Sequence, residues 1–343
     1  MYSEDDLQDA VAAGAISSEA AQALRNHVAT LRASPAVDEE HFRLLTGFND
    51  IFVAIASIIL LVAVGWLGNG LGTGAPGVLI AASSWGLAEY FTRRRRMALP
   101  SILLLAGFIG GVASALFALA SKVFPHTGDR GDALILSGVA LLTAVAALIH
   151  WRRFMVPITV AAGAAAGAGV VAGLVLAALP EHSVTPFLLL LVAGIAIFAL
   201  AMGWDMSDRA RSTRNSDVAF WLHLTAAPMI AHSLFQLLGV FGGEIGVAKA
   251  LVVIALYIVF GVVALAIDRR ALLVSSLAYV LYALYALFKQ AGAVELSAAF
   301  TALVIGSSLL LLSALWHRAR AAIIGLLPDD ITRRLPYLDR AAV

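Results

Sequence analysis

The chain has 343 residues, of which 61% are hydrophobic and only 13% charged, and its mean hydropathy is +0.91. A soluble globular protein is about 45–50% apolar and about 25% charged, so this composition excludes that class and predicts an all-α polytopic membrane helix bundle. The net charge is +1 and the arginines are spread among separate loops, so we expect no nucleic-acid partner. The absence of cysteine excludes disulfides, thiolate metal sites and cysteine nucleophiles.

Residues 1–40 are predicted to form a small cytoplasmic helical hairpin. Gly14 ends the first helix, and Ser17 or Ser18 caps the second. Two helices this short cannot be stable alone, so they must dock on the membrane domain or on a cytoplasmic protein partner. A third helix is expected to start near Asp38 and to run on into the first membrane span.

Ten hydrophobic segments follow, and each is long enough to cross a hydrocarbon core of ~30 Å at ~1.5 Å per residue. They run over residues 48–68, 76–92, 98–121, 131–150, 155–179, 186–204, 218–238, 246–267, 271–288 and 296–316. Residues 41–318 are therefore predicted to form a transmembrane domain in contact with the lipid bilayer. Residues 319–343 alternate apolar and charged groups, which predicts a tail along the cytoplasmic membrane surface.

Arginines are concentrated in every second loop, whereas the alternate loops carry few basic residues. The arginines lie within positions 93–96, 152–153, 209–214, 269–270 and 318–320. Basic residues in short loops mark the cytoplasmic side, so both termini are predicted to be cytoplasmic. The arginines also recur regularly: from Arg95 through Arg152, Arg211 and Arg269 to Arg318, the gaps are 57, 59, 58 and 49 residues. Two interpretations stay open: helix hairpins derived from one repeated unit, or a regular bundle with short loops.

The seventh segment is the most polar. Asp217 to Leu238 reads DVAFWLHLTAAPMIAHSLFQLL, and its polar groups and proline are His223, Thr225, Pro228, His232 and Gln236. On a helix, His232 and Gln236 lie one turn apart, while His223 projects to roughly the opposite side. Ionisable groups at bilayer depth favour a solute or proton pathway, and the alternative is that they only bond neighbouring helices.

Charged residues gather at both ends of the spans. An inner cluster is expected from Asp50, Glu89 and Arg93, acting either as a proton relay or as an interfacial salt-bridge cluster. The outer ends carry Lys122, Lys249, Lys289 and Glu295. These charges could line a vestibule that attracts a polar solute, or they could snorkel to the interface and pair there.

Glycines at four-residue spacing predict close helix contacts, within the chain or across a homo-oligomer. They are Gly107/Gly111, Gly163/Gly167, Gly169/Gly173 and Gly239/Gly243. No catalytic motif is present, so we expect no catalytic residue, no cofactor and no metal site. A metal ion among His126, Asp129, Asp132 and the Glu181-His182 pair lacks any supporting pattern.

The N-terminal pattern AAGAISSEAAQAL, followed by FRLLTGFNDIFV, resembles an uncharacterised family of bacterial multi-span inner-membrane proteins. That family has a short N-terminal helical domain of unknown function, and the resemblance covers residues 5–68. It implies a bacterial source and an inner-membrane location, and it brings no activity or site residues. Our interpretation is a transporter- or channel-like protein for a small or amphipathic solute. The alternative is a non-catalytic scaffold that docks a partner through its N-terminal helices.

Overall fold

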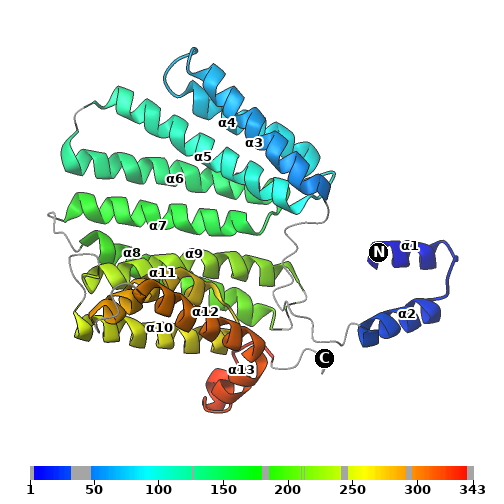
Figure 1. Cartoon of the computed structure of the whole chain (residues 1–343). Helices are drawn as coiled ribbons and strands as arrows, with labels where there is room; N and C mark the ends of the chain where they lie inside the picture. The colour runs from blue at the N-terminus through cyan, green and yellow to red at the C-terminus, as the bar shows by residue number, and fades with distance from the viewer. Residues whose placement is uncertain are drawn as a thin grey trace. The chain divides into compact units, whose positions relative to one another are not determined.

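The computed structural model describes residues 4–31, 48–125, 127–179, 185–209, 211, 213–240, 246–290 and 296–337. All regular secondary structure in these ranges is helical and forms fourteen helices (Figure 1). The contacts divide the chain into two compact units, Met1–Leu44 and Leu45–Val343. Each unit is described separately below.

The first unit contains α1 (Glu4–Ala12) and α2 (Ser18–Leu31). Gly14 has a φ of 69°, which a glycine adopts without steric cost, and it lies in the turn between the two helices. The Ser17 hydroxyl accepts a hydrogen bond of 3.0 Å from the Ala20 amide and so caps α2. The predicted turn and cap are confirmed, whereas the helix expected from Asp38 lies outside the described residues.

The second unit contains the helices that can cross a membrane. Within the described residues, nine helices are long and apolar enough to do so, as the predicted bundle requires. They are α3 (Phe48–Gly68), α5 (Ala98–Val123), α6 (Gly128–Phe154), α7 (Ile158–Ala178), α8 (Thr185–Ser207), α9 (Arg214–Leu237), α10 (Val247–Ile267), α11 (Ala271–Gln290) and α12 (Ser297–Ala314). The predicted second span forms α4 (Ala75–Phe91), which has 17 residues and is about 26 Å long. Two short helices, α13 (Trp316–Ile324) and α14 (Asp329–Thr332), follow.

The helices of this unit are arranged as successive hairpins. The most extensive contacts join α4 with α5, α6 with α7, α8 with α9, and α10 with α11, and an arginine-bearing loop connects each pair. Figure 1 shows α5, α6 and α7 in consecutive rows. Hydropathy placed these helices correctly because the polar loops between them are short.

Each of the four arginine-bearing loops turns through one left-handed residue. In the described part of the chain, the non-glycine residues with positive φ are Arg96, Met155, Arg211 and Asp268, with φ between 52° and 57°. The separations are 59 residues from 96 to 155, 56 from 155 to 211 and 57 from 211 to 268. Because non-glycine residues seldom adopt this conformation, its recurrence at one place in four loops supports a repeated hairpin unit.

Small residues allow the helices within a hairpin to approach closely. A Cβ atom on Gly77 of α4 would lie 2.5 Å from the Gly111 carbonyl oxygen of α5, and one on Gly173 of α7 would lie 2.7 Å from the Ala133 carbonyl oxygen of α6. One on Gly194 of α8 would lie 2.9 Å from the Ile230 side chain of α9. These glycines therefore serve contacts within the chain.

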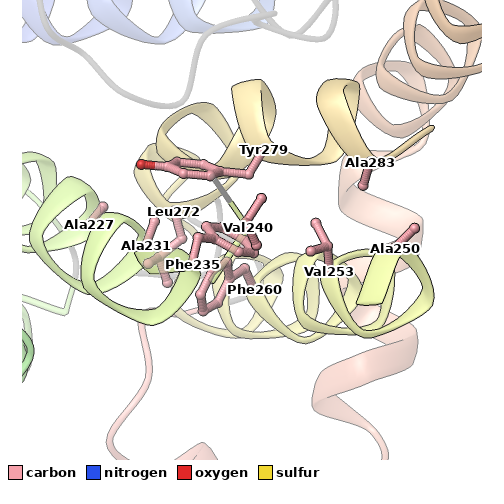
Figure 2. Packing of buried hydrophobic residues seen from close by; sticks show 10 residues of the cluster. All are labelled: Ala227, Ala231, Phe235, Val240, Ala250, Val253, Phe260, Leu272, Tyr279 and Ala283. Carbon is pink, nitrogen blue, oxygen red and sulfur yellow. The ribbon is translucent and has the colours of Figure 1, made fainter. Parts of the chain in front are cut away.

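The best-defined apolar core lies where α9, α10 and α11 meet (Figure 2). The Tyr279 ring of α11 stacks on the Phe235 ring of α9, with centroids 4.2 Å apart and an interplanar angle of 21°. Ala227 and Ala231 keep α9 narrow enough for this approach. The core fixes α11 against α9 and so positions the polar groups at the arginine-bearing ends of both helices.

Candidate functional site

Helix α9 is the most enclosed of the candidate membrane spans. Half of its most apolar 18-residue window is buried, compared with 11–33% for the other eight candidate spans found among the described residues. It contacts α7, α8 and α11. A side chain stabilises the start of α9. The Asp208 carboxylate accepts hydrogen bonds from the Thr213 amide (2.9 Å) and the Thr213 hydroxyl (2.7 Å). The most polar span therefore lies inside the bundle.

Asp205, near the end of α8, is the centre of a buried ionic group. Its Oδ2 lies 2.9 Å from His223 Nε2 of α9, and its Oδ1 accepts a hydrogen bond of 2.7 Å from Arg269 Nη2. All three side chains are buried, with at most 3% of their surface exposed. Arg269 also donates to the Ser216 carbonyl oxygen at 3.0 Å. One carboxylate therefore joins α8, α9 and the start of α11.

The His223 ring has one hydrogen-bond partner among the described residues. A carboxylate paired with an arginine accepts hydrogen bonds, so the Nε2–H of His223 donates to Asp205. Its Nδ1 is buried and has no hydrogen-bond partner in the described part of the chain. A lone pair on Nδ1 tolerates this position, whereas an N–H there would be an unsatisfied buried donor. Protonation of this ring therefore requires a change in its surroundings.

A second buried acid, Asp268, lies beside the first group. It accepts hydrogen bonds from Arg211 Nη1 (2.9 Å) and from Trp316 Nε1 (2.8 Å), and Arg320 Nε lies 3.8 Å from it. Arg211 also donates to the Ile267 and Asp268 carbonyl oxygens, at 2.9 and 3.1 Å. Arginine is suited to these last carbonyls of a helix because they carry partial negative charge.

Two arginines, Arg320 and Arg209, attach the C-terminal segment to the bundle. Arg320 of α13 donates to the Pro336 carbonyl oxygen (2.8 Å) and the Tyr337 carbonyl oxygen (3.1 Å). Arg209 donates to the Leu335 carbonyl oxygen at 2.8 Å and lies over the Tyr337 ring at 4.2 Å. The ionic network thus connects α8, α9, α10 and α11 to the end of the described chain.

The predicted polar groups of α9 divide between two sides of the helix. His223 belongs to the buried ionic network. His232 is half-buried, and its Nδ1 lies 2.7 Å from the Tyr279 hydroxyl of α11. Thr225 donates to the Trp221 carbonyl oxygen of its own helix at 2.9 Å. Gln236 is half-buried and Pro228 is exposed. The hydrogen bonds of the two histidines therefore go to different helices, His223 to α8 and His232 to α11.

The predicted inner charges occupy two places. Glu89 forms ion pairs with Arg93 (3.4 Å) and Arg153 (2.7 Å), so it links the α4–α5 and α6–α7 hairpins. Asp50 is buried and lines a pocket together with Arg95. The sequence does not predict the pairing of Arg153 with Glu89, because a pairing across 64 residues leaves no local pattern.

The predicted outer charges lie at helix ends. Lys122 and Lys289 are exposed in the last turns of α5 and α11, and Lys249 donates to the Gly239 carbonyl oxygen at 3.1 Å. Glu295, His126 and the Glu181-His182 pair fall outside the described residues. Within the described ranges, no group of three or more His, Asp or Glu side chains is placed to hold a metal ion.

Sequence reasoning missed Asp205, Asp268 and the roles of Arg211 and Arg269. Asp205 directly follows the predicted sixth span, and Asp268 follows the eighth, so both were assigned to loops. The signal that could have found them is an acid at the junction between an apolar run and an arginine cluster, since such an acid can pair there.

The chain was also compared with known proteins. No family model, no curated protein and no solved structure matches it. The resemblance of residues 5–68 to an uncharacterised bacterial membrane family stays a prediction. The chain is a multi-span helical membrane protein, and a functional assignment depends on its own geometry.

Proposed function

We propose that the protein is a transporter- or channel-like membrane protein for a small or amphipathic solute, and that His223 couples its movements to protons. The observation that carries this proposal is the buried group that Asp205 and Arg269 form with His223, which lies on the most enclosed candidate span. Buried ionisable groups in membrane spans are costly and often mark ion or proton pathways. His223 lies nine residues after the start of α9, about 14 Å along the helix.

The proposed coupling uses competition for one carboxylate. A proton taken up at His223 Nδ1 makes the ring cationic, and it then competes with Arg269 for Asp205. Release of Arg269 frees the start of α11 from α8. The hydrogen bond between His232 and Tyr279 joins α9 and α11 farther along both helices. A shift of α11 at Arg269 would therefore alter this hydrogen bond as well.

The test is proton movement in proteoliposomes that contain the full chain and a lumenal pH dye. Quaternary amphipathic cations, amino acids and sugars are added one at a time, because none of them carries protons across lipid by itself. We expect at least one solute class to change the lumenal pH, and His223→Gln to abolish this response. His150→Gln is the matched control, since His150 is equally buried but belongs to the α6–α7 hairpin. A response retained in His223→Gln, or none in the original protein, would refute the coupling.

We also propose that the arginine-bearing loops face the cytoplasm of a bacterial inner membrane, with both termini on that side. The excess of basic residues in these loops supports the orientation. Ion pairs between them support their location at one end of the bundle: Arg153 pairs with Glu89, and Arg211 pairs with Asp268. The resemblance of the N-terminal segment is the support for the bacterial source.

A scaffold is the second candidate, favoured by the separate first unit, in which Leu24 is an exposed apolar side chain on α2. It predicts that deletion of residues 1–36 leaves the membrane domain folded but removes a copurifying cytoplasmic protein. If the shortened chain retains the same partners, this candidate is rejected.

A further inference from the structure

The last described segment of the chain folds back onto the bundle. Residues 325–337, here called the C-terminal strap, contain one helix, the four-residue α14. Two arginines outside the strap hold its backbone. Arg209, just after α8, donates to the Leu335 carbonyl oxygen at 2.8 Å, and the buried Arg320 donates to those of Pro336 and Tyr337 at 2.8 and 3.1 Å. Side-chain hydrogen bonds therefore keep the end of the strap in place.

One apolar side chain of the strap is buried in the bundle. Leu335 is 4% exposed and forms a cluster with Ile267, the last residue of α10, and Ile324, the last residue of α13. Phe198 and Met202 of α8 pack against the same cluster. The strap thus completes an apolar layer that reaches from α10 and α13 to α8.

Phe198 connects this apolar layer to the proposed proton site. Its ring lies against the His223 ring, with centroids 5.0 Å apart and an interplanar angle of 71°. His223 is 2% exposed, and the Nδ1 that would take up a proton is buried. Proton transfer needs a donor within hydrogen-bond reach of the nitrogen, directly or through one water. Water must therefore enter before the ring can be protonated.

We propose that the C-terminal strap is a lid over His223. Withdrawal of Leu335 opens the layer against which Phe198 packs and lets water reach Nδ1, and its return excludes water again. The role of this water rests on the proposed proton uptake at His223. The charged groups that act on the ring are Asp205, Arg269 and Arg211. None of these three lies on the strap, so the lid acts by admitting water and not by adding a charge.

The experiment measures how fast His223 reacts with diethyl pyrocarbonate in the full chain in detergent. The reagent attaches an ethoxycarbonyl group to a ring nitrogen that carries a lone pair, which in His223 is Nδ1. Peptide mass spectrometry gives the rate at each histidine separately. We expect slow reaction in the original protein and about tenfold faster reaction in Arg209→Ala, because one charge-assisted hydrogen bond shifts an opening equilibrium by roughly that factor. An unchanged rate in Arg209→Ala would overturn the lid.

Two controls separate opening of the strap from loosening of the whole protein. Arg334→Ala also removes one arginine, but that side chain is exposed on the strap, so the rate at His223 should stay that of the original protein. His150 is 1% exposed and lies in the α6–α7 hairpin, so its own rate should not change in either variant. Equal acceleration at His150 and His223 would show opening of the whole bundle and would overturn the proposal.

A tether tests closure directly. Because the chain has no cysteine, Arg209→Cys and Tyr337→Cys can be combined and joined by a short bismaleimide. These positions suit the tether because the Arg209 guanidinium lies 4.2 Å from the centre of the Tyr337 ring. We expect fast reaction at His223 before cross-linking and the slow rate of the original protein afterwards. A fast rate in the cross-linked protein would also overturn the lid.

Failure of the proposed function would give a different result. The reactivity of His223 reports access to its ring, whereas the lumenal pH reports coupling. Faster reaction in Arg209→Ala, together with no pH response to any solute, would keep the lid and reject proton coupling. If His223→Gln abolishes the pH response while Arg209→Ala leaves the reaction slow, the coupling stands and the lid is rejected.

Discussion

At the scale of single residues, burial separates two kinds of ion pair in this protein. Asp205 pairs with Arg269 in the interior, where at most 3% of either side chain is exposed. Glu89 pairs with Arg153 at the surface, with 32% and 40% exposed. Water and salt screen the charges of the surface pair Glu89–Arg153. The cost of burying the charges of Asp205 and Arg269 can be offset only by the groups that they contact.

Removal of one partner should therefore have very different effects in the two pairs. Arg269→Gln leaves Asp205 with His223 alone, and we expect a loss of about 3–5 kcal/mol in the free energy of unfolding. Arg153→Gln is the control, and a far smaller loss is expected because its partner stays hydrated. Denaturant unfolding in mixed micelles measures both. Similar small losses for the two variants would contradict the buried network.

The sequence identified His223 but not its partner. Hydropathy and helical spacing are local, so they show that a histidine lies in an apolar span. The partners Asp205 and Arg269 are 18 and 46 residues away, on α8 and in the turn before α11. Their meeting depends on how the α8–α9 hairpin packs against α11, which no local pattern specifies. Similarly, the partner of His232 is Tyr279, 47 residues later.

At the scale of secondary-structure elements, each of the four arginine-bearing turns contains one left-handed non-glycine residue, but the side chain of that residue does not have the same role in each turn. Met155 is 42% exposed, whereas the Asp268 side chain contacts Arg211 and Trp316. A left-handed non-glycine residue costs roughly 1–2 kcal/mol relative to the ordinary conformation. At Asp268 the side-chain contacts offset that cost. At Met155 nothing in the structure explains why a non-glycine residue occupies the left-handed position.

Glycine substitution distinguishes the two turns. Met155→Gly should raise the free energy of unfolding by about 0.5–1 kcal/mol, because glycine adopts positive φ without strain. Asp268→Gly relieves the same backbone strain but removes the acceptor of two buried side chains, Arg211 and Trp316, and we expect a net loss of more than about 2 kcal/mol. Thermal unfolding of both variants in one detergent makes the comparison. A gain in both would mean that the Asp268 contacts contribute little.

The helix boundaries were predicted well for a physical reason. In lipid every backbone polar group must be satisfied within a helix, so apolar length alone specifies a span. The first span was predicted at 48–68 and α3 is Phe48–Gly68; the eighth was predicted at 246–267 and α10 is Val247–Ile267. Side-chain pairing has no such simple rule, which is why the fold was predictable and the ionic network was not.

At the scale of the whole molecule, the orientation can be tested directly because the chain has no cysteine. Single cysteines can be introduced at Arg94, in an arginine-bearing loop, and at Asp129, in the first turn of α6 at the opposite end of that helix from its arginines. In intact cells we expect a membrane-impermeant maleimide to label Asp129→Cys but not Arg94→Cys. Both should be labelled after the membrane is permeabilised. The opposite pattern would place the arginine-bearing loops outside.

The short helix α4 has a consequence for the bilayer itself. At about 26 Å it is shorter than a hydrocarbon core of ~30 Å, whereas α6, with 27 residues, is about 40 Å long. A short span is accommodated by local thinning of the bilayer and a long one by tilt, and each costs free energy in proportion to the mismatch. One side of this protein therefore favours shorter acyl chains than the other, and its stability should be greatest in membranes of mixed thickness.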